Sequence, residues 1–214
     1  MGKYIGPVCK LCRREGEKLF LKGERCYGAK CSFEKRGNVS SQGGGRGRQG
    51  ARSDRESDYA RQLRAKQKAR RVYGVFERQF RRYFGVAQHG KGLTGLTLLQ
   101  TLECRLDNIV FRLGFADNRP QARQLVNHGH VLVNGKRADI PSMLLRAGDV
   151  VTVGEGSRKL TYWKEVVDVA EKRVAPLWLE RDVRGYYARV LRLPERAEID
   201  GNLNEQLIVE YYSR

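Results

Sequence analysis

The stretch that decides the fold runs Asn118-Arg-Pro-Gln-Ala-Arg-Gln-Leu-Val-Asn-His-Gly129-His-Val-Leu-Val-Asn134-Gly135-Lys-Arg137. Asn118 can cap a helix that carries a proline in its first turn, and Gly129 can end that helix. Asn134-Gly135 is the strongest short signal for a two-residue β-hairpin turn. The stretch therefore predicts a short helix followed by a hairpin.

Further elements are expected on both sides of this stretch. Apolar residues at helical spacing predict one buried helix from Leu93 to about Gly114, with Cys104 as a core residue. A capping box at 53–56 predicts a helix that ends near Gly74, and a basic, aromatic helix is expected over 76–84. Beyond the hairpin we expect strands at 150–153, 178–180 and 186–193, a helix over 163–170, and a terminal segment over 204–212. The predicted fold class is α+β.

Charge is the second strong feature of the chain. Its 214 residues hold 42 Lys and Arg against 24 Asp and Glu, a net charge of +18. Residues 1–100 carry 24 basic and 8 acidic residues, a net of +16, whereas residues 101–214 carry 18 and 16, a net of +2. This asymmetry favours a localised surface for a polyanion.

Other partners and compartments are less favoured. A membrane surface would require an amphipathic basic helix with a broad Leu, Phe or Trp face, which the sequence lacks. No apolar run approaches the roughly 18 residues of a membrane span. The start of the chain has no apolar leader segment, so we expect a cytoplasmic protein.

Four cysteines near the start of the chain are spaced as metal ligands. Cys9 and Cys12 form one close pair, and Cys26 and Cys31 form a second. Two such pairs fit tetrahedral thiolate coordination, so we expect one structural Zn²⁺. Two disulfides or a redox-active pair are the alternatives, and a cytosolic chain without a βαβ unit disfavours both. Residues 1–36 contain too few apolar side chains to close a core without such a site.

A basic stripe is expected on the first long helix. Its members fall at i, i+3, i+7 and i+10 and so share one face: Arg61, Arg64, Lys68 and Arg71. We interpret the stripe as an RNA-binding face, because acidic partners at i+4 are missing. A solvated charged face is the alternative. The glycine-rich segment 42–50 ahead of it is interpreted as a linker or wrapping arm.

The segment 118–137, with Pro141 to Asp149 after it, resembles the RNA-binding module shared by ribosomal protein S-four, many pseudouridine synthases and bacterial tyrosyl-tRNA synthetases. With the segment 104–114, the four-cysteine start and the ending 204–214, nearly the whole chain resembles the family of bacterial small-subunit ribosomal protein S-four. The resemblance implies a zinc-binding segment at 1–44, a basic helical lobe at 45–97 joined by a C-terminal helix at 203–214, and an α+β lobe at 98–202. It places the module at about 103–165.

The module contributes the remaining candidate RNA-binding residues. Arg119 and Arg123 lie at i, i+4 at a helix N-terminus, where backbone N–H groups and side chains are expected to face one anion. The other candidates in and beside the module are Arg105, Arg112, Gln121, His128, Lys136 and Arg137. Recognition is expected to depend on backbone shape, because the major groove of A-form RNA is too narrow for side chains.

The resulting hypothesis is a structural protein that binds small-subunit ribosomal RNA, clamps a multi-helix junction and nucleates assembly. The resemblance further implies contacts with neighbouring small-subunit ribosomal proteins, proximity to mRNA where it enters, and an influence on translational accuracy. A stand-alone RNA-modifying enzyme is the main alternative, because Arg105-Leu-Asp107 matches the Arg-Leu-Asp of pseudouridine synthases. That motif precedes the module and lacks the expected glycine, so we expect Asp107 to be a surface acid or a salt-bridge partner, and no enzyme activity. A zinc-dependent DNA-binding regulator is a third hypothesis.

Overall fold

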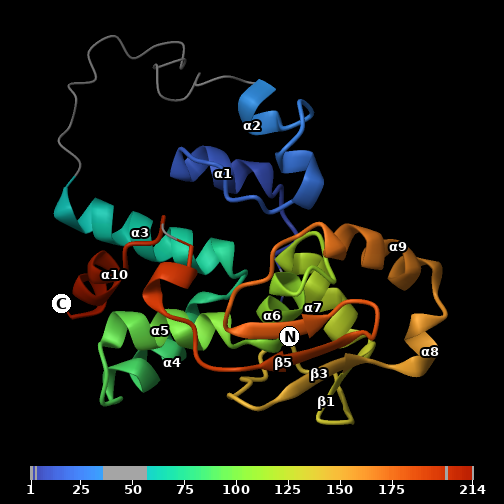
Figure 1. Ribbon diagram of the computed structural model, residues 1–214. Coiled ribbons are helices and arrows are strands. Elements are labelled where there is room, and N and C mark those ends of the chain that lie inside the picture. Colours follow the sequence, from blue (N-terminus) through green and yellow to red (C-terminus); the bar gives the residue numbers. More distant parts are fainter. Residues whose placement is uncertain (1, 3, 36–56, 201, 214) are drawn as a thin grey trace. The chain divides into compact units, whose positions relative to one another are not determined.

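The computed structural model describes residues 2, 4–35, 57–200 and 202–213, which fall into two compact units. Unit 1 comprises residues 1–82 and 202–214, and unit 2 comprises residues 83–201 (Figure 1). Helix α4 (Glu77–Gln88) runs across the boundary. The fold combines helices with an antiparallel sheet and is α+β, as expected.

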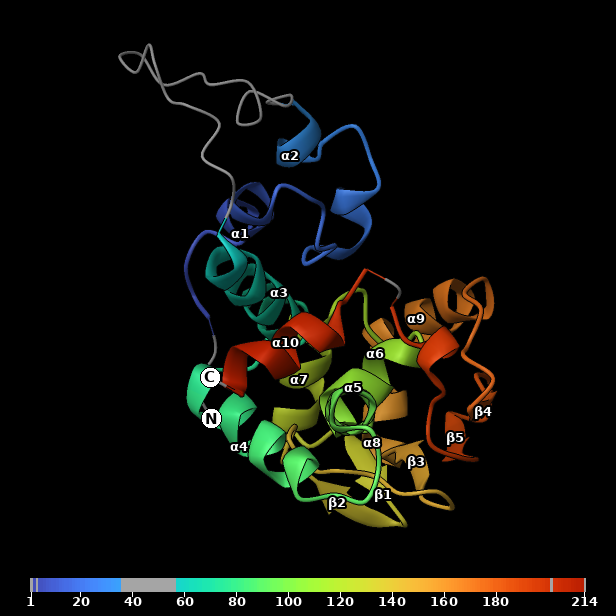
Figure 2. The same cartoon turned by 90° about the vertical axis from the view of Figure 1, so that its left-hand side faces the viewer.

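Unit 1 is helical within the described residues. It contains α1 (Cys9–Glu15), η1 (Gly23–Cys26), α2 (Ser32–Lys35), α3 (Asp58–Val72), the first part of α4, and α10 (Glu205–Tyr212). Helices α3 and α10 lie side by side although the sequence separates them widely (Figure 2). The Gln62 amide donates to Glu210 at 2.9 Å, and the rings of Phe80 and Tyr212 stack with centroids 6.4 Å apart.

Helix α3, which carries the basic stripe, begins after the N-cap residue Ser57. The Ser57 hydroxyl accepts a hydrogen bond from Ala60 N at 3.2 Å, which satisfies one free N–H of the first turn of α3. The capping box expected at 53–56 lies outside the described residues. The helix ends before Gly74, whose φ is +63°, as the sequence predicted.

Unit 2 builds its sheet from hairpins. Its helices are α5 (Thr94–Glu103), α6 (Leu106–Arg112), α7 (Arg119–Asn127), α8 (Glu155–Arg158), α9 (Thr161–Glu171) and η2 (Arg196–Glu198). Its strands are β1 (Val131–Val133), β2 (Lys136–Ala138), β3 (Val150–Val153), β4 (Leu179–Asp182) and β5 (Tyr187–Val190). The order is β2-β1-β3-β5-β4, and all neighbours are antiparallel.

The predicted hairpin is confirmed. Asn134 and Gly135 both have positive φ, +50° and +77°, as a two-residue turn that matches the strand twist requires. Val133 therefore pairs with Lys136, and Val131 pairs with Ala138. The predicted strand at 150–153 is also confirmed as β3.

One apolar core holds unit 2 together. It joins α6, α7 and α9 to the inward side of the sheet, and its largest fully buried side chains include Trp163, Trp178 and Phe115. Leu106, Ile109 and Leu113 of α6, each 0% exposed, confirm the predicted apolar spacing over this part of the chain. Burial of this set is the main favourable term in folding of the unit.

The single helix expected from Leu93 to Gly114 is wrong. Arg105 is extended, with φ −68° and ψ 138°, and it separates α5 from α6. The reason is a bridge to a distant segment, in which Leu106 N donates to Met143 O at 2.8 Å and Leu145 N donates to Cys104 O at 2.9 Å. These long-range bonds replace the helical bonds that the periodicity implied.

Two expectations about organisation can be compared with the structure. Unit 2 begins within α4 and includes α5, whereas the sequence analysis assigned residues up to 97 to the helical lobe. No helix among the described residues is long and apolar enough to cross a membrane.

Candidate nucleic-acid interface

The turn of the β1–β2 hairpin and the end of α7 form a basic, exposed surface in unit 2. Lys136, Arg137 and His128 are all exposed. The Arg137 guanidinium lies against Gly129 and donates to the carbonyl of His128 at 3.4 Å. A side chain at Gly129 would overlap this guanidinium, so the glycine, with φ +72°, allows the arginine to rest on the end of the helix. The structure thus brings Arg137 and His128 together, and Lys136 precedes Arg137 on β2.

The other end of α7 is built differently. Asn118 caps the helix by accepting from Gln121 N at 2.9 Å, and the Gln121 side chain accepts from Asp117 N at 2.9 Å. Both side chains therefore satisfy backbone N–H groups at the start of the helix. Gln121, a predicted RNA-binding residue, has a structural role here.

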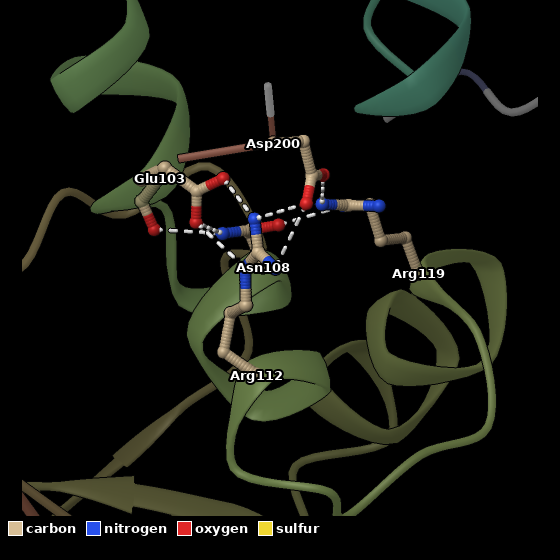
Figure 3. A network of polar contacts seen from close by, with 5 residues as sticks. All are labelled: Glu103, Asn108, Arg112, Arg119 and Asp200. Carbon is tan, nitrogen blue, oxygen red and sulfur yellow. Dashed lines mark hydrogen bonds and ion pairs between the residues drawn. The ribbon is translucent and has the colours of Figure 1, made fainter. Parts of the chain in front are cut away.

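Arg112 and Arg119 belong to a polar network with Glu103, Asn108 and Asp200 (Figure 3). Arg112 binds Glu103 with two nitrogens, at 2.6 and 2.9 Å, and approaches Asp200 at 3.2 Å. Arg119 donates to the Asn108 side-chain oxygen at 2.7 Å and pairs with Asp200 at 3.3 Å. The Asp200 carboxylate thus pairs with Arg119, one of the two arginines that the sequence analysis assigned to an external anion.

The two arginines of this network keep the Asp200 carboxylate ionised. Burial raises the pKa of Asp200, but the positive charges of Arg112 and Arg119 more than offset that effect and lower it below its ordinary value. The Arg119 guanidinium also lies 4.6 Å from the centre of the Phe111 ring. Both arginines are therefore held by the fold and only partly exposed.

Arg105 cannot present its guanidinium to a ligand in this structure. Its side chain is 0% exposed and binds Asp107 with two nitrogens, at 3.0 and 2.6 Å, and Tyr83 OH with a third, at 2.7 Å. Burial alone would lower the pKa of Arg105, but Asp107 and Tyr83 raise it overall. Arg105 is a predicted RNA-binding residue on the helix expected from Leu93 to Gly114, but it precedes α6 and is buried.

Arg123 and Asp107 also differ from expectation. Arg123 is only 6% exposed, and burial lowers its pKa, while its electrostatic neighbours are Asp107, Arg105 and Tyr83. Arg119 and Arg123 therefore face different groups and do not share one anion site. Asp107 is the predicted salt-bridge partner, but it is buried and not on the surface.

The basic stripe on α3 has acidic partners that the sequence analysis missed. Arg64 and Arg71 both pair with Glu15 of α1, Lys68 pairs with Glu17 at 2.6 Å, and Arg61 pairs with Asp58 within its own helix. Arg61 is the most open of the four, with 58% of its side chain exposed. The alternative of a fully solvated stripe is wrong, since Arg71 is only 9% exposed.

The first part of the chain buries most of its cysteines. Cys12, Cys26 and Cys31 are buried, as are Leu19 and Leu21, and Cys9 is half-buried. Lys22 N donates to the Cys26 sulfur at 3.4 Å. Burial raises the pKa of Cys12, and the neighbouring charges of Cys26, Cys9 and Cys31 raise it further, whereas the Ser32 side chain lowers the pKa of Cys9.

None of the four thiols is in a disulfide. Within the described residues, no group of three or more His, Cys, Asp or Glu side chains is already arranged to hold a metal ion. The donor set of four free thiols still fits zinc chemically. Cys104 stands apart from this cluster in unit 2, where burial and the charge of Glu103 raise its pKa to about 12.

Comparison with known proteins decides the family. Residues 3–103 match the ribosomal protein S4/S9 N-terminal domain, and residues 104–151 match the S4 domain. Small ribosomal subunit protein uS4 of Natranaerobius thermophilus is 54% identical over 214 residues, with both chains fully covered. The same protein of Thermus thermophilus is 52% identical over 214 residues, and protein uS4A of Symbiobacterium thermophilum is 55% identical, again with full coverage. The chain belongs to the uS4 family.

This uS4 family consists of ribosomal proteins and not of enzymes, which agrees with the expectation that the chain has no catalytic site. The S4 domain of the family begins at residue 104, close to the predicted start of the module at 103. The match to the S4 domain ends at residue 151. The predicted RNA-binding module extends to about residue 165 and includes α8, so its last part lies outside the match.

Sequence analysis of this uS4 chain did not single out several exposed cations. On α4, Arg78, Arg81 and Arg82 are exposed, whereas Phe80, Tyr83 and Phe84 are buried. The spacing of these arginines, i, i+3 and i+4, places them on one face of the helix. The alternation of basic and aromatic residues over 76–84 was the available signal for this face.

Proposed function

We propose that this chain is a structural constituent of the small ribosomal subunit and binds the subunit's ribosomal RNA. The observation that carries the proposal is full-length identity above 50% to proteins named small ribosomal subunit protein uS4. The pseudouridine synthase alternative is not favoured, and the carboxylate it would require, Asp107, is buried against Arg105.

The exposed cations supply the proposed contacts. In unit 2 these are Lys136 and Arg137, with the exposed His128 beside Arg137, and in unit 1 they are Arg61 and the α4 arginines. Such side chains would neutralise phosphates and release counterions. The buried or network-bound arginines, Arg105, Arg112, Arg119 and Arg123, would act indirectly, by fixing α6 and α7 behind the hairpin surface.

Contacts from both units would let the protein clamp a multi-helix junction of the RNA and stabilise the folded junction against its open forms. That action would favour assembly of the subunit around this protein. We extend the proposal to contacts with neighbouring small-subunit proteins, to mRNA where it enters, and to an influence on translational accuracy. A protein of this kind would act in the bacterial cytoplasm.

The RNA proposal is tested by binding of the full chain to small-subunit ribosomal RNA. The double variant Lys136→Gln/Arg137→Gln is expected to weaken binding by about 1–3 kcal/mol, because two charge-assisted phosphate contacts are lost. Lys164→Gln, which removes one exposed cation on α9 with no ion pair among the described residues, is the control for loss of positive charge outside the hairpin. Unchanged affinity of the double variant at fixed salt would show that RNA does not contact the hairpin.

We further propose that Cys9, Cys12, Cys26 and Cys31 hold one structural Zn²⁺. The donor set of four free thiols and the burial of Cys12, Cys26 and Cys31 support this. Four thiolates would close the coordination sphere, so the ion would stabilise residues 9–31 and take no part in catalysis. Nearby basic residues, including Lys22, Arg25 and Arg13, would offset the thiolate charge.

Native mass spectrometry of protein purified under reducing conditions tests the zinc proposal. One Zn²⁺ per chain is expected, and Cys12→Ser/Cys26→Ser is expected to lose it. Cys104→Ser, which removes a thiol outside the cluster, is the matched control and is expected to keep the ion. Metal-free protein with two disulfides would contradict the proposal.

A further inference from the structure

Unit 1 contains a cavity that neither the basic stripe nor the cysteine cluster explains. It has a volume of about 340 Å³ and lies between the start of the chain, α1 and the turn from α3 to α4. The residues that matter for its chemistry are Tyr4, Lys10, Arg14, Arg70, Arg71 and Phe76. The volume falls at the small end of the range for ligand sites, about 300–1,000 Å³.

The cavity carries more positive charge than the fold neutralises. Arg71 pairs with Glu15, and Arg70 lies 3.4 Å from Glu77. Lys10 and Arg14, both exposed, form no ion pair among the described residues. Two of the four cations on the wall are therefore available to an anion.

Electrostatic repulsion points the same way. Burial lowers the pKa of Arg71, and the neighbouring charge of Arg14 lowers it further. An anion beside Arg14 would offset the repulsion between these two guanidinium groups. Glu15 is engaged by Arg64 as well as by Arg71, so it cannot fully neutralise both Arg71 and Arg14.

Two aromatic rings at the cavity are incompletely covered. The residues Tyr4 and Phe76 are 43% and 45% exposed, and neither ring stacks on another ring of the described residues. Gly2 lies directly against the Phe76 ring, where a Cβ would have no room, which holds the start of the chain at this wall. Exposed rings beside unpaired cations are the combination with which proteins bind unpaired nucleotides.

We propose that this cavity receives one unpaired nucleotide of the bound RNA, with its base against Tyr4 and Phe76 and its phosphate between Lys10 and Arg14. This inference rests on the proposed RNA-binding function and extends it. It assigns unit 1 a contact to a base in addition to contacts with phosphates. An A-form helix would not enter the cavity, because its bases are stacked and paired.

The base contact and the phosphate contact are expected to affect the salt dependence of RNA affinity differently. Tyr4→Leu/Phe76→Leu is expected to weaken binding to small-subunit ribosomal RNA about tenfold, with an unchanged log-log slope of affinity against salt, since stacking neutralises no phosphate. Lys10→Gln/Arg14→Gln is expected to flatten that slope by about 1.4 to 1.8, because each lost contact removes roughly 0.7 to 0.9 of a released counterion.

Single-site controls of the same residue types lie elsewhere in unit 1. Tyr27→Leu replaces a ring that is 74% exposed outside the cavity, and Lys30→Gln removes an exposed cation. Neither control is expected to reproduce the effect of its matched double variant. If both cavity variants bind the RNA as the unaltered chain does, the cavity inference is overturned while the proposed function stands. If the unaltered chain does not bind the RNA specifically, the proposed function itself fails.

A crosslinking experiment tests the same contact without comparing the affinities of variants, which a loss of stability could change. A photoreactive benzoylphenylalanine in place of Phe76, irradiated in the RNA complex, is expected to crosslink to a single unpaired nucleotide. Crosslinks only to paired nucleotides, or crosslinks in assembled subunits only to a neighbouring protein, would overturn the inference. The second result would show that the cavity receives a protein segment instead of RNA.

Discussion

Unit 2 folds around one continuous apolar core, and its ion pairs are added to that core, whereas in unit 1 ion pairs join α1 to α3. In unit 2 the pair between Arg105 and Asp107 is local and lies beside the core. In unit 1, Glu15 of α1 binds Arg71 of α3 across 56 positions of sequence. Arginine ion pairs therefore add to an apolar core in unit 2, whereas in unit 1 they partly replace such a core in joining the helices.

The comparison predicts the largest effect for Arg105→Met. Removal of the guanidinium leaves the Asp107 carboxylate buried without its charge partner, which is expected to cost about 3–5 kcal/mol of the stability of unit 2. Urea unfolding, followed by the fluorescence of Trp163 and Trp178, measures this. The double variant Arg105→Met/Asp107→Leu is expected to recover part of the loss, because no buried charge remains. A loss below about 1 kcal/mol in the single variant would show that the pair is not buried in solution.

Glu15→Gln tests the ion pairs that join α1 to α3 in unit 1. It removes the carboxylate that both Arg64 and Arg71 use, and the expected cost is about 1.5–3 kcal/mol, since hydrogen bonds to charged groups are lost. The loss is expected as faster hydrogen exchange in α1 and α3, with α6 and α7 unaffected. Glu24→Gln, an exposed acid of the same unit, is the control. Equal loss of protection in both units would contradict the comparison.

The same contrast shows what the sequence could predict. The Asn134-Gly135 hairpin, the Asn118 cap and the apolar face of α6 follow from neighbouring residues, and the structure confirms all three. The break between α5 and α6 at Arg105 could not be foreseen from the sequence. It depends on the hydrogen bond from Leu106 N to Met143 O, and these two residues are 37 positions apart in the sequence. Local patterns report local geometry, and this break is set by a distant segment.

The candidate site was predictable to a similar degree. Charge counts directed attention to basic residues, but the exposure of those residues depends on which carboxylates pair with them in the fold. Glu15 and Glu17 reach the α3 stripe from another segment, and Asp200 reaches Arg112 and Arg119 from the end of unit 2. No spacing rule within a helix could reveal those partners. The zinc site stays a prediction, since coordination depends on an ion as well as on the spacing of four cysteines.

A smaller effect is expected from the Asp200 network under acid. The pKa of Asp200 is lowered in the folded chain below its ordinary 3.8, so the unfolded state binds more protons as the pH approaches that value. The stabilisation is therefore complete above about pH 4 and is lost as the pH falls through the folded pKa. With 43% of the side chain exposed, its size is on the order of 1 kcal/mol.

Asp200→Asn is expected to remove this part of the acid dependence of unit 2. Asp139→Asn, which replaces an exposed carboxylate with no ion pair among the described residues, is the matched control and is expected to leave it in place. Urea unfolding at a series of pH values from about 6 to about 3 measures the difference. An Asp200→Asn profile parallel to that of the unaltered chain would show that the carboxylate is not held by Arg112 and Arg119.

The smallest effects are expected at two helix caps, one in each unit. Asn118 accepts from Gln121 N at 2.9 Å in unit 2, and Asn204 accepts from Leu207 N at 3.2 Å in unit 1. Alanine at either position is expected to cost about 1 kcal/mol, since one N–H of the first turn loses its acceptor. The two losses are expected to differ in extent. Helix α7 contributes Ala122 and Val126 to the continuous core, so Asn118→Ala is expected to lower the stability of unit 2 as a whole.

Helix α10 is the last helix of the described chain and buries Ile208 as its one fully buried residue, so Asn204→Ala is expected to increase local opening of this helix. Hydrogen exchange separates the two outcomes, because local opening affects α10 and its partner α3 only. Asn127→Ala, at the far end of α7, removes the same kind of amide without removing a cap and is the control. If Asn204→Ala lowers protection throughout unit 1, then α10 is as integral to its unit as α7 is to unit 2. Ion pairs and a short helix would in that case cooperate as fully as a continuous apolar core.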